Sequence, residues 1–330
     1  MSDLALAAFA AETGTHVVSE PRERRFERFR RAFDADGYLA SLRARGFRFL
    51  GRSEAEFPPL LRELHDPPAG LFLRGAADPN LLSEPAVAIV GARACSSYGS
   101  QIARLFGREL AAAGLVVISG LARGVDGEAH RGALEAGGHT VAVLGCGVDR
   151  DYPAAHAQLA RGIGETGLVV SEYAPGVEPA PWRFPARNRI IAGLAAATAI
   201  VEARERSGAL ITADFALEAG REVFAVPGEI TSCLSSGTNA LLRLGATPLT
   251  QVADVLQALG FESAPAQRIE LGKDAEAVLA ALADEPAGAD DLGRRTGLGA
   301  AALGTALSEL ELAGAVAEAD GLYRGVRPPG

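Results

Sequence analysis

The stretch AVAIVGARACSSYG, residues 86–99, runs from an apolar segment through a glycine-containing loop into the start of a helix. Further apolar runs with the character of strands are LVVIS (115–119), TVAVLG (140–145), LVVSE (168–172), TAIVEA (198–203) and EVFAVPG (222–228). Continuous apolar strands that alternate with helices indicate a parallel sheet covered on both faces. We therefore predict an α/β fold with a doubly wound, mostly parallel sheet.

The flanking sequence divides the chain into further parts. Residues 1–55 are polar and Arg-rich and predict a short N-terminal helical region. Residues 56–260 form a Rossmann-like domain with its lead-in, FPPLLRELHDPPAGLFLRG (57–75), which we interpret as a linker packed on the strands and helices after it. TPLT (247–250) and a helix over 251–259 close this domain, and residues 261–271 form a second linker. Residues 272–330 contain helices at 275–283 and 300–312 and a final hairpin, which is the winged-helix arrangement.

Composition favours a cytoplasmic protein that uses no cofactor. Of 330 residues 48% are hydrophobic, yet no apolar run approaches the roughly 20 residues that span a bilayer, so no membrane partner is expected. The N-terminus lacks the pattern of a signal peptide. Cys95, Cys146 and Cys233 lie far apart and form no metal-ligand pattern.

Charge is distributed unevenly along the chain, which has a net charge of −9. Residues 262–330 carry 6 Lys+Arg against 12 Asp+Glu, a net charge of −6, and Lys273 is the only lysine. The expected second helix of the helix–turn–helix pair, residues 300–312, contains no cation. Because DNA-reading winged helices place cations against phosphates, we predict that this one does not bind DNA.

Candidate ligand-binding residues come directly after the predicted strands, at the edge where parallel sheets bind ligands. Glycines permit close approach, helix starts offer N–H groups, and arginine binds phosphate through two hydrogen bonds. Seven arginines gather on this edge, and we expect each of them in a loop. The expected site comprises Gly91, Arg93 and Ser97, then Gly120 and Arg123, then Arg183, Phe184, Arg187, Asn188 and Arg189, and finally Ser207 and Gly208, with Arg204 and Arg206 beside them.

Cations that follow a phosphate backbone, combined with aromatic stacking surfaces, are typical of single-stranded DNA binding without sequence preference. Trp182 and Phe184 could supply the stacking surface, or they could belong to the core. Asp126 is interpreted as a helix cap rather than a catalyst. The first loop is not GxGxxG, GxxxxGK[ST] is absent, and we find no nucleophile–base pair, so we expect no enzymatic activity.

Five motifs in order resemble the DNA-processing protein A (DprA/Smf) family: AIVGARACSSYG, SGLARGVDGEAH, FPARNRIIAGL, SGALITADFALEAGREVFAVPG and GTNALLRLGA. The resemblance extends from about residue 57 to residue 259, and a winged-helix tail is common in this family. It implies binding of single-stranded DNA, homodimerisation, and loading of the RecA recombinase in natural transformation or recombinational repair. The apolar stretch 241–249 is the expected dimer contact.

The sequence departs from the family pattern after the third strand of the parallel sheet. The family's YPxxN is Tyr152-Pro153-Ala154-Ala155-His156 here, and a nearby lysine of many members is absent. A nucleotide-processing Rossmann-like enzyme, of the type that hydrolyses nucleoside monophosphates, is the alternative. Its PGGxGTxxE signature is not met, because Pro227-Gly228-Glu229 and Gly237-Thr238 are separate in the chain.

Overall fold

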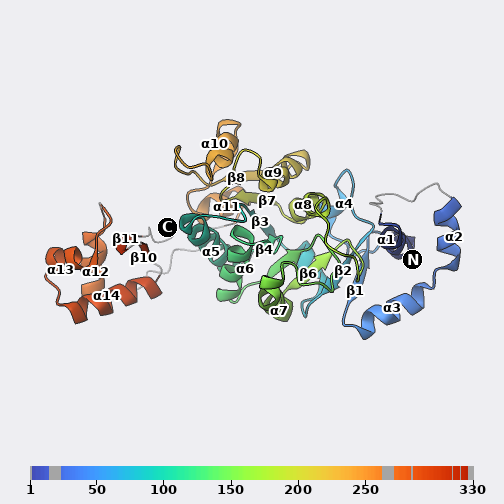
Figure 1. The fold of residues 1–330 in the computed structure, drawn as a ribbon, viewed down its shortest axis with the longest axis horizontal. Helices are drawn as coiled ribbons and strands as arrows, with labels where there is room; N and C mark the ends of the chain where they lie inside the picture. The colour runs from blue at the N-terminus through green and yellow to red at the C-terminus, as the bar shows by residue number, and fades with distance from the viewer. Residues whose placement is uncertain are drawn as a thin grey trace. The chain divides into compact units, whose positions relative to one another are not determined.

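The computed structural model describes residues 2–14, 24–261, 271–283, 285–313, 315–319 and 321–325. Contacts within the chain divide it into two units, Met1–Glu262 and Ser263–Gly330 (Figure 1). Nearly all of the linker predicted at 261–271 lies outside the described residues. None of the described helices is long and apolar enough to cross a membrane.

A nine-stranded sheet forms the centre of the first unit, in the order β1-β2-β6-β5-β4-β3-β7-β8-β9. The seven strands that follow β2 in this order, β6-β5-β4-β3-β7-β8-β9, are mutually parallel, as predicted. The first of them in the chain, β3, lies in the middle of the sheet beside β7, so the direction of winding reverses between these two strands. The parallel strands are β3 (Ala86–Val90), β4 (Val116–Ser119), β5 (Thr140–Val143), β6 (Leu168–Ser171), β7 (Ala197–Ile200), β8 (Glu222–Ala225) and β9 (Thr247–Pro248).

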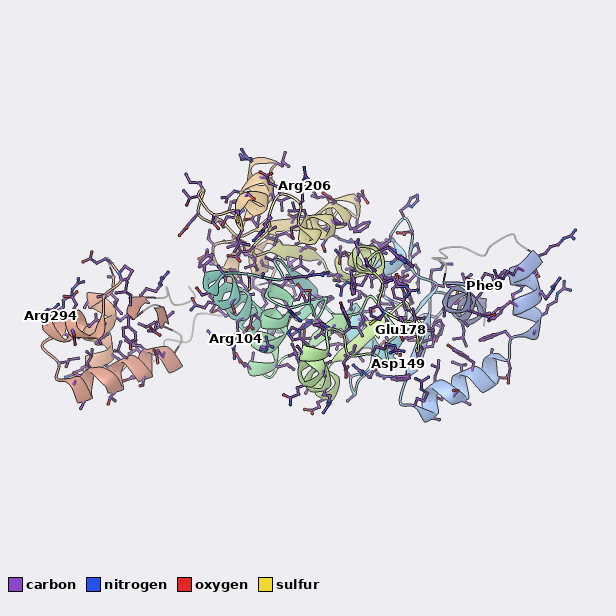
Figure 2. The ribbon with its side chains drawn as sticks, in the orientation of Figure 1. Phe9, Arg104, Asp149, Glu178, Arg206 and Arg294 are labelled. Atoms are coloured by element: carbon purple, nitrogen blue, oxygen red, sulfur yellow. The ribbon has the colours of Figure 1, made fainter. Side chains whose placement is uncertain are left out.

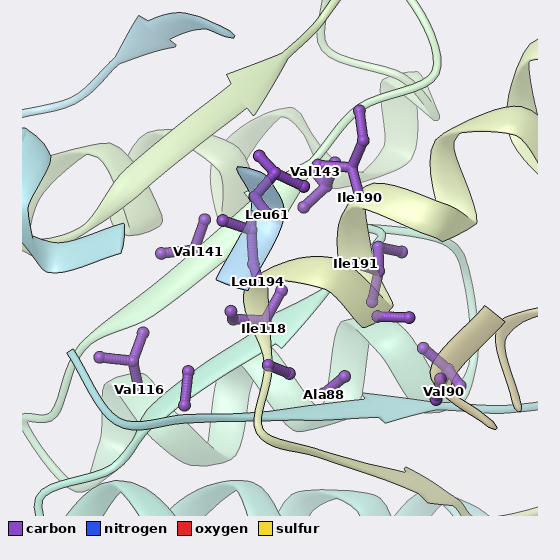
Figure 3. Close-up of a cluster of buried hydrophobic side chains, with 14 of the residues drawn as sticks. Leu61, Ala88, Val90, Val116, Ile118, Val141, Val143, Ile190, Ile191 and Leu194 are labelled. Atoms are coloured by element: carbon purple, nitrogen blue, oxygen red, sulfur yellow. The ribbon is translucent and has the colours of Figure 1, made fainter. Parts of the chain in front are cut away.

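Helices cover both faces of this sheet because successive residues of a strand point to opposite sides. In β3, Ala88 and Val90 face one apolar cluster, part of which Figure 3 shows, while Val87 and Ile89 face another. The first cluster is covered by α4 (Pro59–Arg62), α8 (Arg183–Leu194), α9 (Gly208–Glu218) and α10 (Ser236–Arg243). On the other face lie α5 (Ser97–Ala112), α6 (Val125–Glu135), α7 (Ala157–Thr166) and α11 (Val252–Ala258).

Two strands that sequence analysis missed extend the sheet at one edge. The LFL run was interpreted as part of a linker, but Leu71, Phe72 and Leu73 are fully buried in strand β2 (Gly70–Arg74). This strand pairs antiparallel with β6 and with β1 (Arg48–Gly51), which lies in the region predicted to be helical. Because the strands are short, their apolar runs resemble any packed loop until the partner strand is known.

Among the described residues three helices precede β1: α1 (Ser2–Thr13), α2 (Arg24–Ala32) and α3 (Ala35–Ala44). Leu4, Leu42 and Phe47 pack with Phe72 of β2, so this N-terminal region is fastened to the antiparallel edge of the sheet.

The second unit has the predicted winged-helix arrangement. Helices α12 (Lys273–Ala281), α13 (Ala289–Thr296) and α14 (Ala300–Leu312) surround an apolar core of their own. Strands β10 (Val316–Ala319) and β11 (Leu322–Gly325) then pair antiparallel as the wing.

Candidate functional site

Nine of the twelve predicted site residues meet at the carboxyl ends of β3, β4, β5 and β7, where the winding of the sheet reverses and α/β proteins bind ligands. Two adjoining hollows, of about 320 Å³ and 210 Å³, lie here. Both are lined by Arg93, Ala122, Phe184 and Arg187. Of the other expected residues, Gly120 and Arg123 line the larger hollow, and Gly91, Asn188, Ser207 and Gly208 line the smaller one.

A stack of three side chains forms one wall. The guanidinium carbon of Arg93 lies 5.5 Å from the centroid of the Phe184 ring, and the Tyr152 ring stacks on Phe184 with centroids 5.2 Å apart. Arg93 is exposed and makes no ion pair within the described part of the chain, while Tyr152 is 43% exposed. Gly145 lets Phe184 approach the sheet, since a Cβ there would lie 2.9 Å from the ring. The wall therefore combines an exposed cation with one exposed ring, Tyr152, and one half-buried ring, Phe184.

Sequence analysis had not counted Tyr152 as a site residue. The sequence signal that could have identified Tyr152 was its place in the element that corresponds to the family's YPxxN. Phe184, which could have been core, is half-buried and lines both hollows.

The loop after β4 is held by three buried side chains. The Asp126 carboxylate accepts hydrogen bonds from the N–H groups of Gly120 and Ala122, at 3.1 and 3.4 Å. His156 donates to the Leu121 carbonyl at 3.0 Å, and Leu121 has a φ of 57°, a conformation that costs a branched side chain free energy. Asp126 thus organises this loop and does not cap the start of its own helix, which begins after Gly124.

Arg187 is the third of these side chains. It is buried and donates to the carbonyls of Gly120, at 2.7 Å, and of Val143. Burial lowers the pKa of Arg187 to about 10, while the nearby Asp126 carboxylate acts in the opposite direction. Since its Nη1 group is directed at two backbone carbonyls, we interpret Arg187 as a support for the pocket floor.

The expectation that all seven arginines lie in loops is wrong for three of them. Arg183, Arg187 and Arg189 belong to helix α8, because PARNRIIAGL continues the helix once it packs on the sheet. Arg189 is not brought to the hollows: it is buried and forms ion pairs with Asp66 and Glu172. Arg183 packs over the rings of Trp182 and Tyr173, at 4.9 and 5.2 Å, outside both hollows.

The N-terminus of α5 was expected to offer free N–H groups, but a carboxylate occupies it. Glu202, at the end of β7, is 4% exposed and accepts hydrogen bonds from the Ser96 N–H at 2.9 Å and the Ser96 hydroxyl at 2.5 Å. The Ser96 hydroxyl in turn accepts from the Gly99 N–H. Ser97 is the first helical residue and is exposed, but it lines neither hollow. A negative side chain therefore stands where dinucleotide-binding folds place a phosphate.

The N-terminus of α9 closes the other side of the smaller hollow. Ser207 caps this helix by accepting from the Ala209 N–H, and the Asn188 amide donates to the Gly208 carbonyl at 3.0 Å. Arg204 and Arg206 are exposed in the preceding loop, and Figure 2 shows Arg206 there. Within the described residues neither of them makes an ion pair.

The fold and the site define a class: a Rossmann-like protein with an arginine–aromatic pocket at the reversal of its sheet and a winged helix behind it. Over residues 48–260 the chain matches the family model described as DNA recombination-mediator protein A, and over 262–321 the model described as DprA winged helix domain. The chain belongs to the DNA recombination-mediator protein A family, which confirms the resemblance seen in the sequence.

Similar proteins include the DNA processing protein DprA of Streptococcus pneumoniae, 47% identical over 62% of this chain and 72% of the relative. Protein Smf of Escherichia coli is 40% identical over 82% of this chain and 75% of that protein. The solved structure of the S. pneumoniae protein has a TM-score of 0.66 at 38% identity and covers 80% of this chain and 93% of its own. A Helicobacter pylori DprA structure, described for its single-stranded DNA binding mode, has a TM-score of 0.58 at 32% identity, with 64% and 95% covered.

Proposed function

We propose that this protein binds single-stranded DNA without sequence preference, in the two hollows at the carboxyl edge of the sheet. The observation that carries the proposal is the stack of Arg93, Phe184 and Tyr152. A guanidinium can pair with a phosphate, and an exposed ring can stack on any base, which is the combination that sequence-tolerant binding requires. Arg123, which lines the larger hollow, and Arg204 and Arg206, in the loop before α9, are also exposed and add positive charge to this edge of the sheet.

We further propose that the bound strand is delivered to the RecA recombinase, in natural transformation or in recombinational repair. Membership of a family described as recombination mediators supports this role. The protein would act as a cytoplasmic homodimer and would catalyse no reaction itself.

A nucleotide-processing enzyme fits the pocket less well. Glu202 would repel a mononucleotide phosphate at the N-terminus of α5, and the Asp126 carboxylate is engaged by two backbone N–H groups. Gly228 and Gly237 donate their N–H groups to Asn239 and to Ala203, so the glycines of the unmet signature are also engaged within the protein.

The test compares labelled oligothymidine with a duplex of equal length by fluorescence anisotropy, alongside incubation with AMP. We expect tight binding of the single strand, weaker binding of the duplex, and no release of adenine. Equal affinity for both DNAs would contradict the proposed preference. Adenine release that is lost in Asp126→Asn would instead support the enzyme.

A further inference from the structure

Helix α2 is the most strongly charged element that the proposed site does not use. Its sequence, RRFERFRRA (24–32), contains five arginines and a single acid, Glu27, in a chain whose net charge is −9. A run of like charge on a helix usually indicates a solvated face. The contacts of α2 argue for more than that.

The apolar side of α2 is firmly docked. Phe26 is fully buried, and its ring meets that of Phe9 in α1 edge-on at 5.2 Å between centroids. Phe29 contacts Phe9 at 5.4 Å and stacks on Phe33 at 5.3 Å. Figure 2 marks Phe9 on α1, the helix beside α2. Because these rings fix the rotation of α2 about its axis, its arginines are held on a defined outer surface.

The positive charge of that surface is balanced by few acidic side chains within the described residues. All five arginines are exposed. Arg30 pairs with Glu27 at 3.2 Å, and the Arg25 guanidinium lies 5.8 Å from the centroid of the Phe9 ring. Within the described part of the chain, Arg24, Arg28 and Arg31 make no ion pair.

The spacing of these three arginines makes the helix less stable by itself. Arg24 and Arg28 are four residues apart, and Arg28 and Arg31 are three apart, so their charges repel on one helical face. A bound polyanion would turn this repulsion into attraction.

We propose that α2 is a second contact surface for the DNA backbone, which binds a part of the strand that extends beyond the hollows. The inference rests on the proposed function. Phosphate is the chemistry that fits, because arginine pairs with it bidentately and a strand supplies phosphates at regular intervals along the helix. The contacts would carry no sequence information, since they involve no base.

The test uses Arg28→Gln/Arg31→Gln in the full-length protein, with Arg43→Gln/Arg161→Gln as the matched control. The control removes the same charge from two other exposed arginines, one on α3 and one on α7, that make no ion pair within the described residues. Binding is measured against oligothymidines of about six and about forty nucleotides, bracketing the footprint of a small single-strand site. Each titration is repeated across a fourfold range of salt.

For the long strand, losing two phosphate contacts should reduce the magnitude of the slope of log K against log salt by about 1.4. A fourfold rise in salt should then weaken the wild-type protein about sevenfold more than the variant. The short strand should bind the variant, the control and the wild-type protein alike. Arg28→Lys/Arg31→Lys should restore most of the salt dependence, because the charge is kept.

An unchanged salt dependence for the long strand, in a variant whose circular dichroism matches the wild type, would overturn the proposal and leave the pocket function standing. Such a result would point to an acidic protein as the partner of α2. If the wild-type protein bound neither strand, the proposed function and this inference would fail together. If Arg93→Ala abolished short-strand binding while the long strand kept its dependence on Arg28 and Arg31, the two surfaces would be shown to act separately.

Discussion

Arg93 is the exposed cation of the stack, and its guanidinium is not engaged in an ion pair within the described residues. We expect Arg93→Ala to weaken single-stranded DNA binding by about 1.5–3 kcal/mol, the scale of a lost charge-assisted hydrogen bond. The loss should be the same for every base composition, because a phosphate contact does not read bases. Anisotropy titrations with several homopolymers measure it. An unchanged dissociation constant would remove Arg93 from the site.

The variant Phe184→Ala tests whether the Phe184 ring stacks on a DNA base or packs in the protein core. If its ring stacks on a base, Phe184→Ala should lower affinity while the salt dependence of binding stays nearly constant, since no phosphate contact is lost. If the ring serves mainly the core, the variant should melt several degrees lower and bind normally when folded. Its place in the lining of both hollows favours the first result. Thermal melting and DNA titration on the same preparation distinguish the two.

Arg187 should behave differently from Arg93, although both line the hollows. Arg187→Ala would leave the Gly120 and Val143 carbonyls without their donor and Asp126 without a nearby buried cation. Removing one member of such a buried set typically costs about 3 kcal/mol or more of folding free energy. Urea denaturation should therefore show a large loss for Arg187→Ala and almost none for Arg93→Ala. A stably folded Arg187→Ala protein with impaired DNA binding would instead make Arg187 a direct phosphate contact.

At the scale of elements, the winged helix has a fold that often binds nucleic acid, but its surface charge does not suit contact with DNA phosphates. Helix α14 contains no cation and carries Glu309 and Glu311. Arg294 and Arg295 of α13 are already paired with acids of the same unit. We therefore expect this unit to contact a protein or to regulate the molecule.

Truncation after Gly260 tests this expectation, because the apolar core of the second unit shares no residue with the cores of the first. The shortened protein should bind single-stranded DNA as tightly as the full chain. A tenfold or greater loss would show that the winged helix contributes to DNA binding.

For the whole molecule, the prediction to be tested is that the protein forms a homodimer. In the stretch 241–249, Leu241 and Leu249 are buried in the core, whereas Leu244 is 84% exposed and Ile230, in the loop before α10, is 95% exposed. Contiguous exposed apolar patches mark interaction sites, and we predict that Leu244 and Ile230 contribute to such a patch. We expect multi-angle light scattering at micromolar concentration to return twice the chain mass, and Leu244→Asp with Ile230→Asp to return a monomer. A wild-type mass near 34.0 kDa would refute dimerisation.

The sequence by itself determined where the parallel strands lie along the chain, their parallel pairing, the winged helix and most of the residues that line the pocket. These features are local: an apolar run, a glycine and a helix start at fixed spacing are enough to place a strand end, and parallel strands bring their ends to one edge. Gly91, Arg93, Arg123, Phe184 and Ser207 could be assigned to that edge for this reason.

Only the tertiary structure decided which partner each polar side chain has. Arg187 and Arg189 lie in one motif two residues apart, yet one supports the pocket floor and the other pairs with Asp66 and Glu172. Glu202, just after β7, fills the N-terminus of α5 from more than a hundred residues away, and β2 becomes a strand only when β6 lies beside it. Burial makes such long-range pairings strong, because water no longer competes for the hydrogen bonds, and no local pattern specifies them.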